Sequence, residues 1–272
     1  IIDGVALTKF LYWIKKVNKK KITEVDAQIK LEKFRKKSNY YLYPSFDTIA
    51  GSGENGAIVH YRAIAGADRE LASNDLVLLD SGGHYRDGTT DITRTIAIGT
   101  PPRDAVAAYS HVLQSHIHLA MAKFPEGTNG KQLDAIARAP LWAAGLDFAH
   151  GTGHGVGHVL SVHEGPASIS KRGEVALEAG MVLSNEPGYY QTGDWGIRIE
   201  NLIVVTPVKQ TGFLEFETIT LCPLDHRLID KKRLDAGEIG WIDHYHRAVY
   251  EQLHPHLSPM AKSWLEAACC PL

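Results

Sequence analysis

One pattern occurs in both halves of the sequence: an apolar strand that ends in a carboxylate, a turn, and a second strand that contains a carboxylate. The carboxylates are Asp80 and Asp91 in the first half and Glu186 and Glu200 in the second. Acidic residues are depleted in strands, and burying an unpaired carboxylate is costly. Two copies of so costly a pattern predict a pseudo-two-fold fold, in which two βαβ-like halves meet at one shared site.

Hydrophobic periodicity places helices and strands around these units. A period of about 3.6 residues predicts helices over 3–17, 23–37, 103–122, 130–144, 238–254 and 258–269. Apolar, β-branched runs predict strands over 57–61, 75–80, 89–99, 180–186 and 197–205. Because no low-complexity linker divides the chain, we expect one α/β (α+β) domain over residues 1–272. Its core covers about 40–222, and a helical C-terminal extension covers about 223–272.

Charge and composition exclude several classes of partner. The chain has 29 Lys and Arg against 31 Asp and Glu, and this net charge of -2 provides no broad basic surface for nucleic acid. No apolar run reaches the ~20 residues of a membrane-spanning helix. The three cysteines form no obvious disulfide framework, which indicates a reducing, cytoplasmic location. Because the sequence begins without methionine and already with helical periodicity, we expect a segment of a longer protein whose upstream domains are absent.

Each carboxylate has an ordinary explanation when it is considered alone. Asp80 precedes Ser-Gly-Gly and could begin a turn, and Glu200 could form a salt bridge with Arg198 on the same face of its strand. Four convergent carboxylates, however, cannot all stay ionised without added positive charge. Carboxylates with one imidazole suit two divalent cations about 3.5–4 Å apart, Mn²⁺ first, with Zn²⁺, Co²⁺ or Fe²⁺ as alternatives.

Residues 150–166, HGTGHGVGHVLSVHEGP, concentrate histidine and glycine near these units. If residues 150–158 are extended, the histidines share one face, and the glycines leave the other face bare for a substrate or another backbone. His150 and His154 would then lie about 13 Å apart, too far to bind the same ion. We therefore expect one of them to bind metal and the other to contact substrate.

Four motifs occur in a fixed order along the chain: LLDSGGHYRDGTTDITRT, HGTGHGVG with VHEGP, NEPGYY, and GIRIEN. Together they resemble the catalytic domain of Xaa-Pro aminopeptidase (aminopeptidase P), in peptidase family M24. The resemblance implies the pita-bread fold, with pseudo-two-fold related halves. Members of that family often carry two further N-terminal domains and dimerise, so a homodimer is among the expected assemblies.

The resemblance also implies roles for individual residues. The five implied metal ligands are Asp80, Asp91, His154, Glu186 and Glu200. Manganese is the usual metal of that family. The implied substrate-binding and catalytic histidines are His60, His150 and His163. Supporting positions that bind substrate near the metals correspond to Tyr190 and Arg198.

The implied reaction releases the N-terminal residue from peptides whose second residue is proline. A hydroxide that bridges two metal ions would attack the first peptide carbonyl. Glu186 would act as general base and then as general acid, and His163 would stabilise the oxyanion. His60 would help to place the substrate beside the scissile bond.

Two other functions share this pattern of residues. A prolidase, which cleaves Xaa-Pro dipeptides, would have the same metal site. His154 and His163 are nine positions apart, however, and prolidases typically have a shorter gap. A non-catalytic peptide-binding module on the same fold would have lost metal ligands, whereas all five are present here.

Overall fold

The structure is a computed structural model that describes residues 1–16, 22–209 and 212–272. Its α-helices are α1 (Ile2–Lys16), α2 (Glu24–Arg35), α3 (Arg103–Ala120), α4 (Gly130–Ala143), α5 (Ala236–Leu253) and α6 (Pro259–Ala268). These are the six helices that the periodicity predicts; position 17, the expected end of the first, lies outside the described residues. None of the helices in these ranges combines the length and apolar character that crossing a membrane requires.

The strands of the described residues form five sheets, two of which carry the carboxylates. The first of these sheets has the order β2–β3–β6, with strands β2 (Ile49–Ser52), β3 (Leu76–Ser81) and β6 (Ile92–Ala97). The second has the order β10–β13–β14–β7, with strands β10 (Val182–Asn185), β13 (Asn201–Pro207), β14 (Phe213–Thr218) and β7 (Lys123–Pro125).

Three smaller sheets complete the fold. They are β1 (Tyr41–Pro44) with β4 (Gly83–Tyr85) and β5 (Gly88–Thr89), β11 (Gly188–Gln191) with β12 (Trp195–Arg198), and β8 (Gly153–His154) with β9 (Ser168–Ile169). The order along the chain is therefore strand, hairpin, strand in both halves: β3, β4–β5, β6 and β10, β11–β12, β13.

The expectation of βαβ-like halves is wrong, because the carboxylate strands pair antiparallel, β3 with β6 and β10 with β13. Parallel pairing would require a crossover connection, usually a helix. Here each connection forms a hairpin of its own instead. The repeat that the sequence predicts is nevertheless present as two similar antiparallel units.

Three predicted strands differ from the structure. The one expected at 89–99 is split into β5 and β6, so Asp91 lies just before β6 and not inside a strand. The strand expected at 57–61 is absent: Gly53–Ala57 forms the 3₁₀-helix η1, and a turn follows. That turn is fixed because the Tyr61 hydroxyl donates to the buried Glu24 carboxylate at 2.7 Å. The strand expected at 197–205 breaks between β12 and β13, because the backbone N–H of Glu200 bonds to the carbonyl of Thr93 at 3.1 Å instead.

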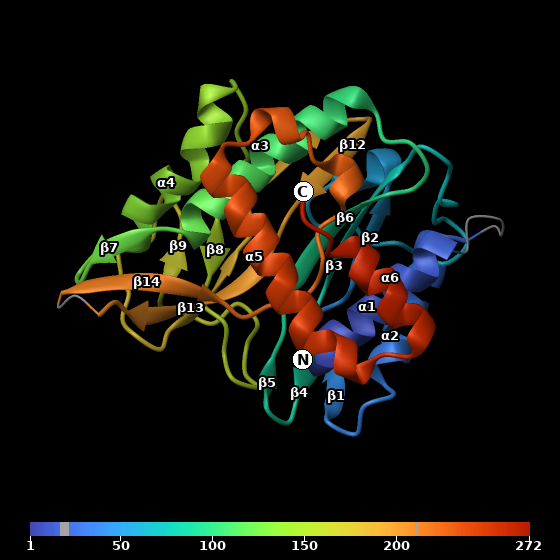
Figure 1. Cartoon of the computed structure of the whole chain (residues 1–272), viewed down its shortest axis with the longest axis horizontal. Helices are drawn as coiled ribbons and strands as arrows, with labels where there is room; N and C mark the ends of the chain where they lie inside the picture. Colours follow the sequence, from blue (N-terminus) through green and yellow to red (C-terminus); the bar gives the residue numbers. More distant parts are fainter. Residues whose placement is uncertain (17–21, 210–211) are drawn as a thin grey trace.

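Period-two alternation gives β3 and β6 two different faces. Val77 and Leu79 of β3 pack with Ile92 and Ile96 of β6 in a buried cluster that also contains side chains of α1 and α2 (Figure 1). Asp80 therefore lies on the opposite face, away from these helices. The helices thus cover one face of the sheet and leave the other face to the polar residues.

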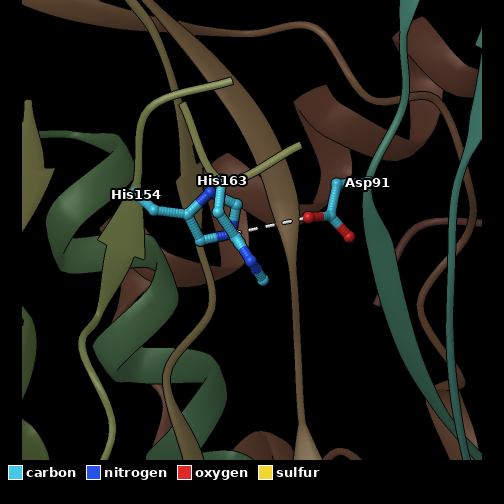
Figure 2. Close-up of side chains that lie close together, drawn as sticks. All are labelled: Asp91, His154 and His163. Carbon is cyan, nitrogen blue, oxygen red and sulfur yellow. Dashed lines mark ion pairs between the residues drawn. The ribbon is translucent and has the colours of Figure 1, made fainter. Parts of the chain in front are cut away.

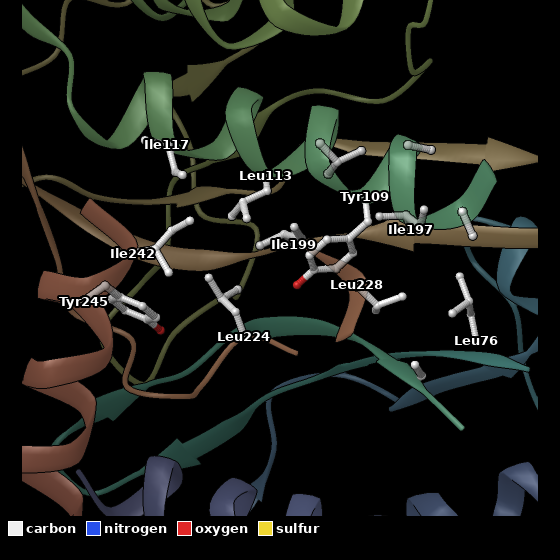
Figure 3. Packing of buried hydrophobic residues seen from close by; sticks show 14 of the residues in the cluster. Leu76, Tyr109, Leu113, Ile117, Ile197, Ile199, Leu224, Leu228, Ile242 and Tyr245 are labelled. Carbon is white, nitrogen blue, oxygen red and sulfur yellow. The ribbon is translucent and has the colours of Figure 1, made fainter. Parts of the chain in front are cut away.

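A second buried cluster lies between α3, α5 and β12 (Figure 3). Tyr109, Leu113 and Ile117 of α3 approach Ile242 and Tyr245 of α5 there. This contact confirms the helical spacing of apolar residues that the sequence predicts over 238–254. The division into a core and a C-terminal extension stays a prediction, although α5 shares this cluster with the central strands.

His246 of α5 is a fully buried imidazole within this packing. Its Nε2 accepts a hydrogen bond from the N–H of Leu224 at 3.1 Å, and its Nδ1 lies 2.9 Å from Nε2 of His226. Burial lowers the pKa of His246 to about 3, and the charges of His226 and Arg94 act in the same direction. The ring is therefore neutral in the folded chain at neutral pH.

We expect His246→Gln to weaken the pH dependence of stability in mild acid. The unfolded chain protonates this histidine near pH 6.5, whereas the folded chain does so only near pH 3. As the pH decreases below 6.5, the free energy of unfolding therefore decreases. This group contributes up to about 1.4 kcal/mol per pH unit to that decrease. Urea unfolding at several pH values between about pH 6 and pH 4.5 measures the slope.

His244→Gln is the matched control, because His244 is exposed on the same helix. We expect the control to keep the wild-type slope, whatever its absolute stability. A wild-type slope in His246→Gln as well would contradict the assignment of acid sensitivity to the buried ring.

Candidate metal centre

The two carboxylate sheets meet at a cavity of about 390 Å³. Nine residues that the sequence selects line it: His60, Asp80, Asp91, His150, His154, His163, Glu186, Arg198 and Glu200. Apolar lining comes from Phe46, Ile49 and Val59. Residues that lie far apart in the sequence are therefore brought to one place, as the repeated pattern predicts.

Asp80 is the penultimate residue of β3 and is nearly buried, 9% exposed. Its Oδ2 accepts a hydrogen bond from Arg198 Nη2 at 2.6 Å, while its Oδ1 is buried and accepts none from the described residues. Burial raises the pKa of Asp80 despite the Arg198 charge, and the charge of Glu186 adds to the rise. The salt bridge considered between Arg198 and Glu200 is thus made with Asp80 instead.

Asp91 and Glu186 both approach the same nitrogen of His154 in the cavity. Nε2 of His154 lies 3.5 Å from Oδ2 of Asp91 and 3.2 Å from Oε1 of Glu186, and Figure 2 shows the first of these contacts. Burial raises the pKa of Asp91 to about 7, although the His154 hydrogen bond opposes the rise. Burial alone would lower the pKa of His154, but the hydrogen bonds to both carboxylates raise it to about 11.

Glu200 is the most deeply placed carboxylate of the four, with 1% exposure. Its Oε2 accepts a hydrogen bond from the Thr93 hydroxyl at 2.7 Å. Burial raises the pKa of Glu200 well above its ordinary value, and the charges of Asp91, Glu186 and Asp80 add to the rise. Like charges therefore oppose each other here at a nearly buried position.

The donor atoms fit a pair of divalent cations. One donor atom from each of Asp80, Asp91 and Glu200 lies within 4.8 Å of the others, and the same holds for His154, Glu186 and Glu200. Nδ1 of His154 lies 3.0 Å from the Gly155 carbonyl, which fixes a tautomer whose Nε2 faces the carboxylates. The partnerless Oδ1 of Asp80 and the raised pKa values of three carboxylates indicate that added positive charge would stabilise the site.

Residues 150–158 do not form the extended segment that the sequence analysis considers. Only Gly153–His154 forms a strand, β8, and the chain then turns back, because the N–H of Glu164 donates to the Gly155 carbonyl at 2.8 Å. This return brings the His163 ring to 4.3 Å from the His154 ring (Figure 2). One nitrogen of His163 also lies within 4.8 Å of donor atoms of Asp91 and His154, a proximity that strand geometry could not predict.

His150 lines the cavity and contacts Tyr190, which is not itself among the lining residues. Nε2 of His150 lies 2.7 Å from the Tyr190 hydroxyl, which also accepts a hydrogen bond from Arg198 Nη1 at 2.7 Å. Burial lowers the pKa of His150, so its ring is neutral and able to face an apolar group. His60 is exposed at the cavity edge, in the turn after η1 rather than in a strand.

Sequence reasoning did not assign functions to several residues that support this site. Thr93 donates to Glu200 and also accepts from Arg198 Nε at 3.1 Å. Ser184 donates to Oε1 of Glu186 at 3.1 Å and accepts from the backbone N–H of His154 at 2.9 Å. Thr93 follows Asp91 by two positions and Ser184 precedes Glu186 by two positions, and this spacing is the signal that could have identified them.

Two curated proteins with similar sequences are named as Xaa-Pro aminopeptidases. A probable Xaa-Pro aminopeptidase P of Laccaria bicolor is 43% identical over 285 residues, which cover 100% of this chain and 44% of the relative. Xaa-Pro aminopeptidase app-1 of Caenorhabditis elegans is 42% identical over 99% of this chain and 46% of the relative. The chain therefore spans less than half the length of these curated relatives.

The solved structures include two that are informative here. The crystal structure of an X-prolyl aminopeptidase from Caenorhabditis elegans, described as a cytosolic enzyme with a di-nuclear active site, matches with a TM-score of 0.96 and 41% identity. The match covers 99% of this chain and 46% of the Caenorhabditis elegans chain. Dipeptidase PepE from Mycobacterium ulcerans matches with a TM-score of 0.69 and 34% identity, over 80% of this chain and 55% of that chain.

These likenesses confirm the pita-bread fold that the motifs predict. Residues 1–207 match the family model described as metallopeptidase family M24. Residues 212–272 match the model of the C-terminal region of peptidase M24. The chain belongs to metallopeptidase family M24.

Proposed function

We propose that this chain is the catalytic part of a metal-dependent aminopeptidase that releases the N-terminal residue from peptides whose second residue is proline. The observation that carries the proposal is the convergence of four carboxylates and His154 on one cavity, with pKa values that favour added cations. Relatives with the same architecture are named Xaa-Pro aminopeptidases, which supports the proline requirement.

The residues proposed to hold two divalent cations are Asp80, Asp91, His154, Glu186 and Glu200. Oxygen donors with a single imidazole favour Mn²⁺, with Zn²⁺, Co²⁺ or Fe²⁺ as alternatives. The di-nuclear site of the Caenorhabditis elegans structure supports the number of ions. When bound, such ions polarise the scissile carbonyl and lower the pKa of water toward neutrality.

Glu186 is proposed as the general base and then the general acid. Burial would raise its pKa, but the hydrogen bond and charge of His154 outweigh burial and lower it, so the carboxylate is ionised. Its side chain is 17% exposed and lines the cavity, so an attacking water can reach it. Glu186 would take a proton from that water and deliver it to the leaving nitrogen.

Three histidines are proposed to contact the substrate. His163 would donate a hydrogen bond to the oxyanion that develops on the scissile carbonyl. His60, at the cavity edge, would orient the peptide there. His150, held by Tyr190 and the Arg198 guanidinium behind it, would face the proline ring together with the apolar side chain of Phe46.

Prolidase activity is the second candidate, because prolidases share the fold. Prolidase from Pyrococcus furiosus matches with a TM-score of 0.67 and 31% identity, over 80% of this chain and 62% of that chain. The higher TM-score of the X-prolyl aminopeptidase, 0.96, favours the aminopeptidase reaction. A non-catalytic module is disfavoured, since the cavity retains all five expected ligands.

Peptides with N-terminal Xaa-Pro are the proposed partners, and the cytosol is the proposed location. The Caenorhabditis elegans enzyme is described as cytosolic, and all three cysteines of this chain are free, which fits a reducing compartment. The homodimer stays a prediction.

We expect Asp91→Asn and His154→Ala to lose bound metal and most activity. Each change removes a donor atom or its charge from the cluster, so both should lower kcat/KM by about 100-fold or more. Elemental analysis measures the metal, and release of arginine from Arg-Pro-Pro with Mn²⁺ measures the activity. Asp194→Asn, an exposed aspartate in the β11–β12 turn, is the control and should behave as wild type. Full metal content in either site variant would refute the ligand assignment.

We expect Arg-Pro-Pro to be cleaved with at least about 10-fold higher kcat/KM than Arg-Ala-Pro. Proline lacks an N–H and has a fixed φ, so a neutral imidazole and apolar lining suit it. Comparing Arg-Pro-Pro with the dipeptide Arg-Pro separates the two candidates. Equal rates on proline and alanine peptides would exclude the proline requirement, and preference for the dipeptide would support a prolidase.

A further inference from the structure

Val159 has an unusual backbone conformation close to the cavity. Its φ of +55° lies in the left-handed region, which β-branched residues rarely adopt. The residue belongs to the loop of residues 157–163, which leads directly to His163. Such a conformation persists only where surrounding contacts hold it.

The contact that holds Val159 comes from the first half of the fold. Its backbone N–H donates a hydrogen bond to Oγ1 of Thr89, in β5, at 2.9 Å. Oγ1 of Thr89 also lies 2.9 Å from Nδ1 of His84, so the hydroxyl is held from two sides. A Cβ added at Gly88 would lie 3.7 Å from Nδ1 of His158, which shows that loop and hairpin also approach at the neighbouring residues.

His84 is a rigid support for the Thr89 hydroxyl. It is 6% exposed, and its ring lies 5.0 Å from the Tyr43 ring of β1. His84 and Thr89 are also directly opposite each other in the β4–β5 pairing. The hydroxyl therefore has little freedom to move when the loop moves.

The hydrogen bonds that hold the loop lie at its base, not at the ring of His163. The Gly157 N–H donates to the Ser161 carbonyl at 2.9 Å, and the Ser161 N–H donates to Oε2 of Glu164 at 2.9 Å. His163 is exposed in the cavity wall, and its ring meets that of His154 edge-on (Figure 2). The ring's place beside the carboxylates therefore depends on the path of the loop backbone.

We propose that Thr89 is a positioning residue for His163, acting through the Val159 backbone. The hydroxyl of the β4–β5 hairpin fixes the loop, and the loop holds the imidazole beside Asp91 and His154. The inference rests on the proposed function for what His163 does, and it adds a residue outside the cavity lining to that reaction.

Thr89→Val tests the inference, because it keeps the shape of the side chain and removes the hydroxyl. We expect kcat on Arg-Pro-Pro to fall roughly 3- to 10-fold, the value of one hydrogen bond, with KM little changed. Metal content should stay at the wild-type level. Amides of residues 158–163 should exchange faster with deuterium. Thr89→Ser, which keeps the hydroxyl, should restore both kcat and slow exchange.

Thr206→Val is the matched control, since Thr206 is also a half-buried strand threonine with a hydroxyl contact, to the Glu215 carbonyl at 3.4 Å. Wild-type kcat in Thr89→Val, an equal loss in Thr89→Ser, or loss of metal along with kcat would each overturn the inference. If the wild-type chain cleaves no Xaa-Pro peptide, the proposed function fails and the exchange data decide alone. Faster exchange confined to Thr89→Val would then support the role of the hydroxyl, and unchanged exchange would overturn it.

Discussion

The burial of Asp80, Asp91 and Glu200, together with the repulsion among the four clustered carboxylates, is the constraint on which the rest of this structure depends. Asp91 and Glu200 are almost completely buried, which raises the pKa of both, and the charge of Asp91 further raises the pKa of Glu200. The fold has to supply what opposes this repulsion: the Arg198 guanidinium on Asp80, hydroxyl donors on Glu186 and Glu200, and apolar packing behind the strands. Removing a like charge from such a place normally stabilises a protein, so its persistence indicates a role for added cations. A ligand that binds only the folded chain would offset the unfavourable free energy of the clustered carboxylates and so stabilise the fold.

Arg94 connects the carboxylates to the C-terminal part of the chain. It is buried, and it donates to the Glu200 carbonyl at 2.7 Å, to Oδ1 of Asn201 at 2.8 Å and to the Tyr245 hydroxyl at 2.8 Å. A buried guanidinium with its donors satisfied fixes geometry strongly, because any shift leaves a charged group unpaired. The backbone of one carboxylate is thereby tied to α5. Helix α5 thus supports the site through this link as well as through its packing on α3.

How much the sequence could predict follows from the range of the interactions involved. Asp91 was identifiable because a charge within an apolar, strand-like sequence is costly to bury and therefore informative, although the structure places it just before β6 rather than inside a strand. The helices were predictable because apolar periodicity is a local signal. The turn at His60, the break before Glu200 and the path from His154 to His163 were not. These features depend on hydrogen bonds to distant residues, namely Glu24, Thr93 and Thr89 in that order. Local periodicity cannot predict such bonds.

The hairpins explain how two similar halves can build one asymmetric site. The paired strands β3–β6 and β10–β13 supply comparable carboxylates, so they alone would give a cavity with nearly equivalent ends. The hairpins inserted at the same place in each unit differ. Hairpin β11–β12 brings Tyr190 and Arg198 to His150, whereas hairpin β4–β5 turns its Thr89 hydroxyl toward the loop that carries His163. Beside β11–β12 the cavity thereby gains a neutral imidazole backed by a phenol, and beside β4–β5 it gains an imidazole on a loop held by a hydrogen bond. The two hairpins therefore give the cavity different groups, which is the asymmetry that the proposed aminopeptidase reaction requires.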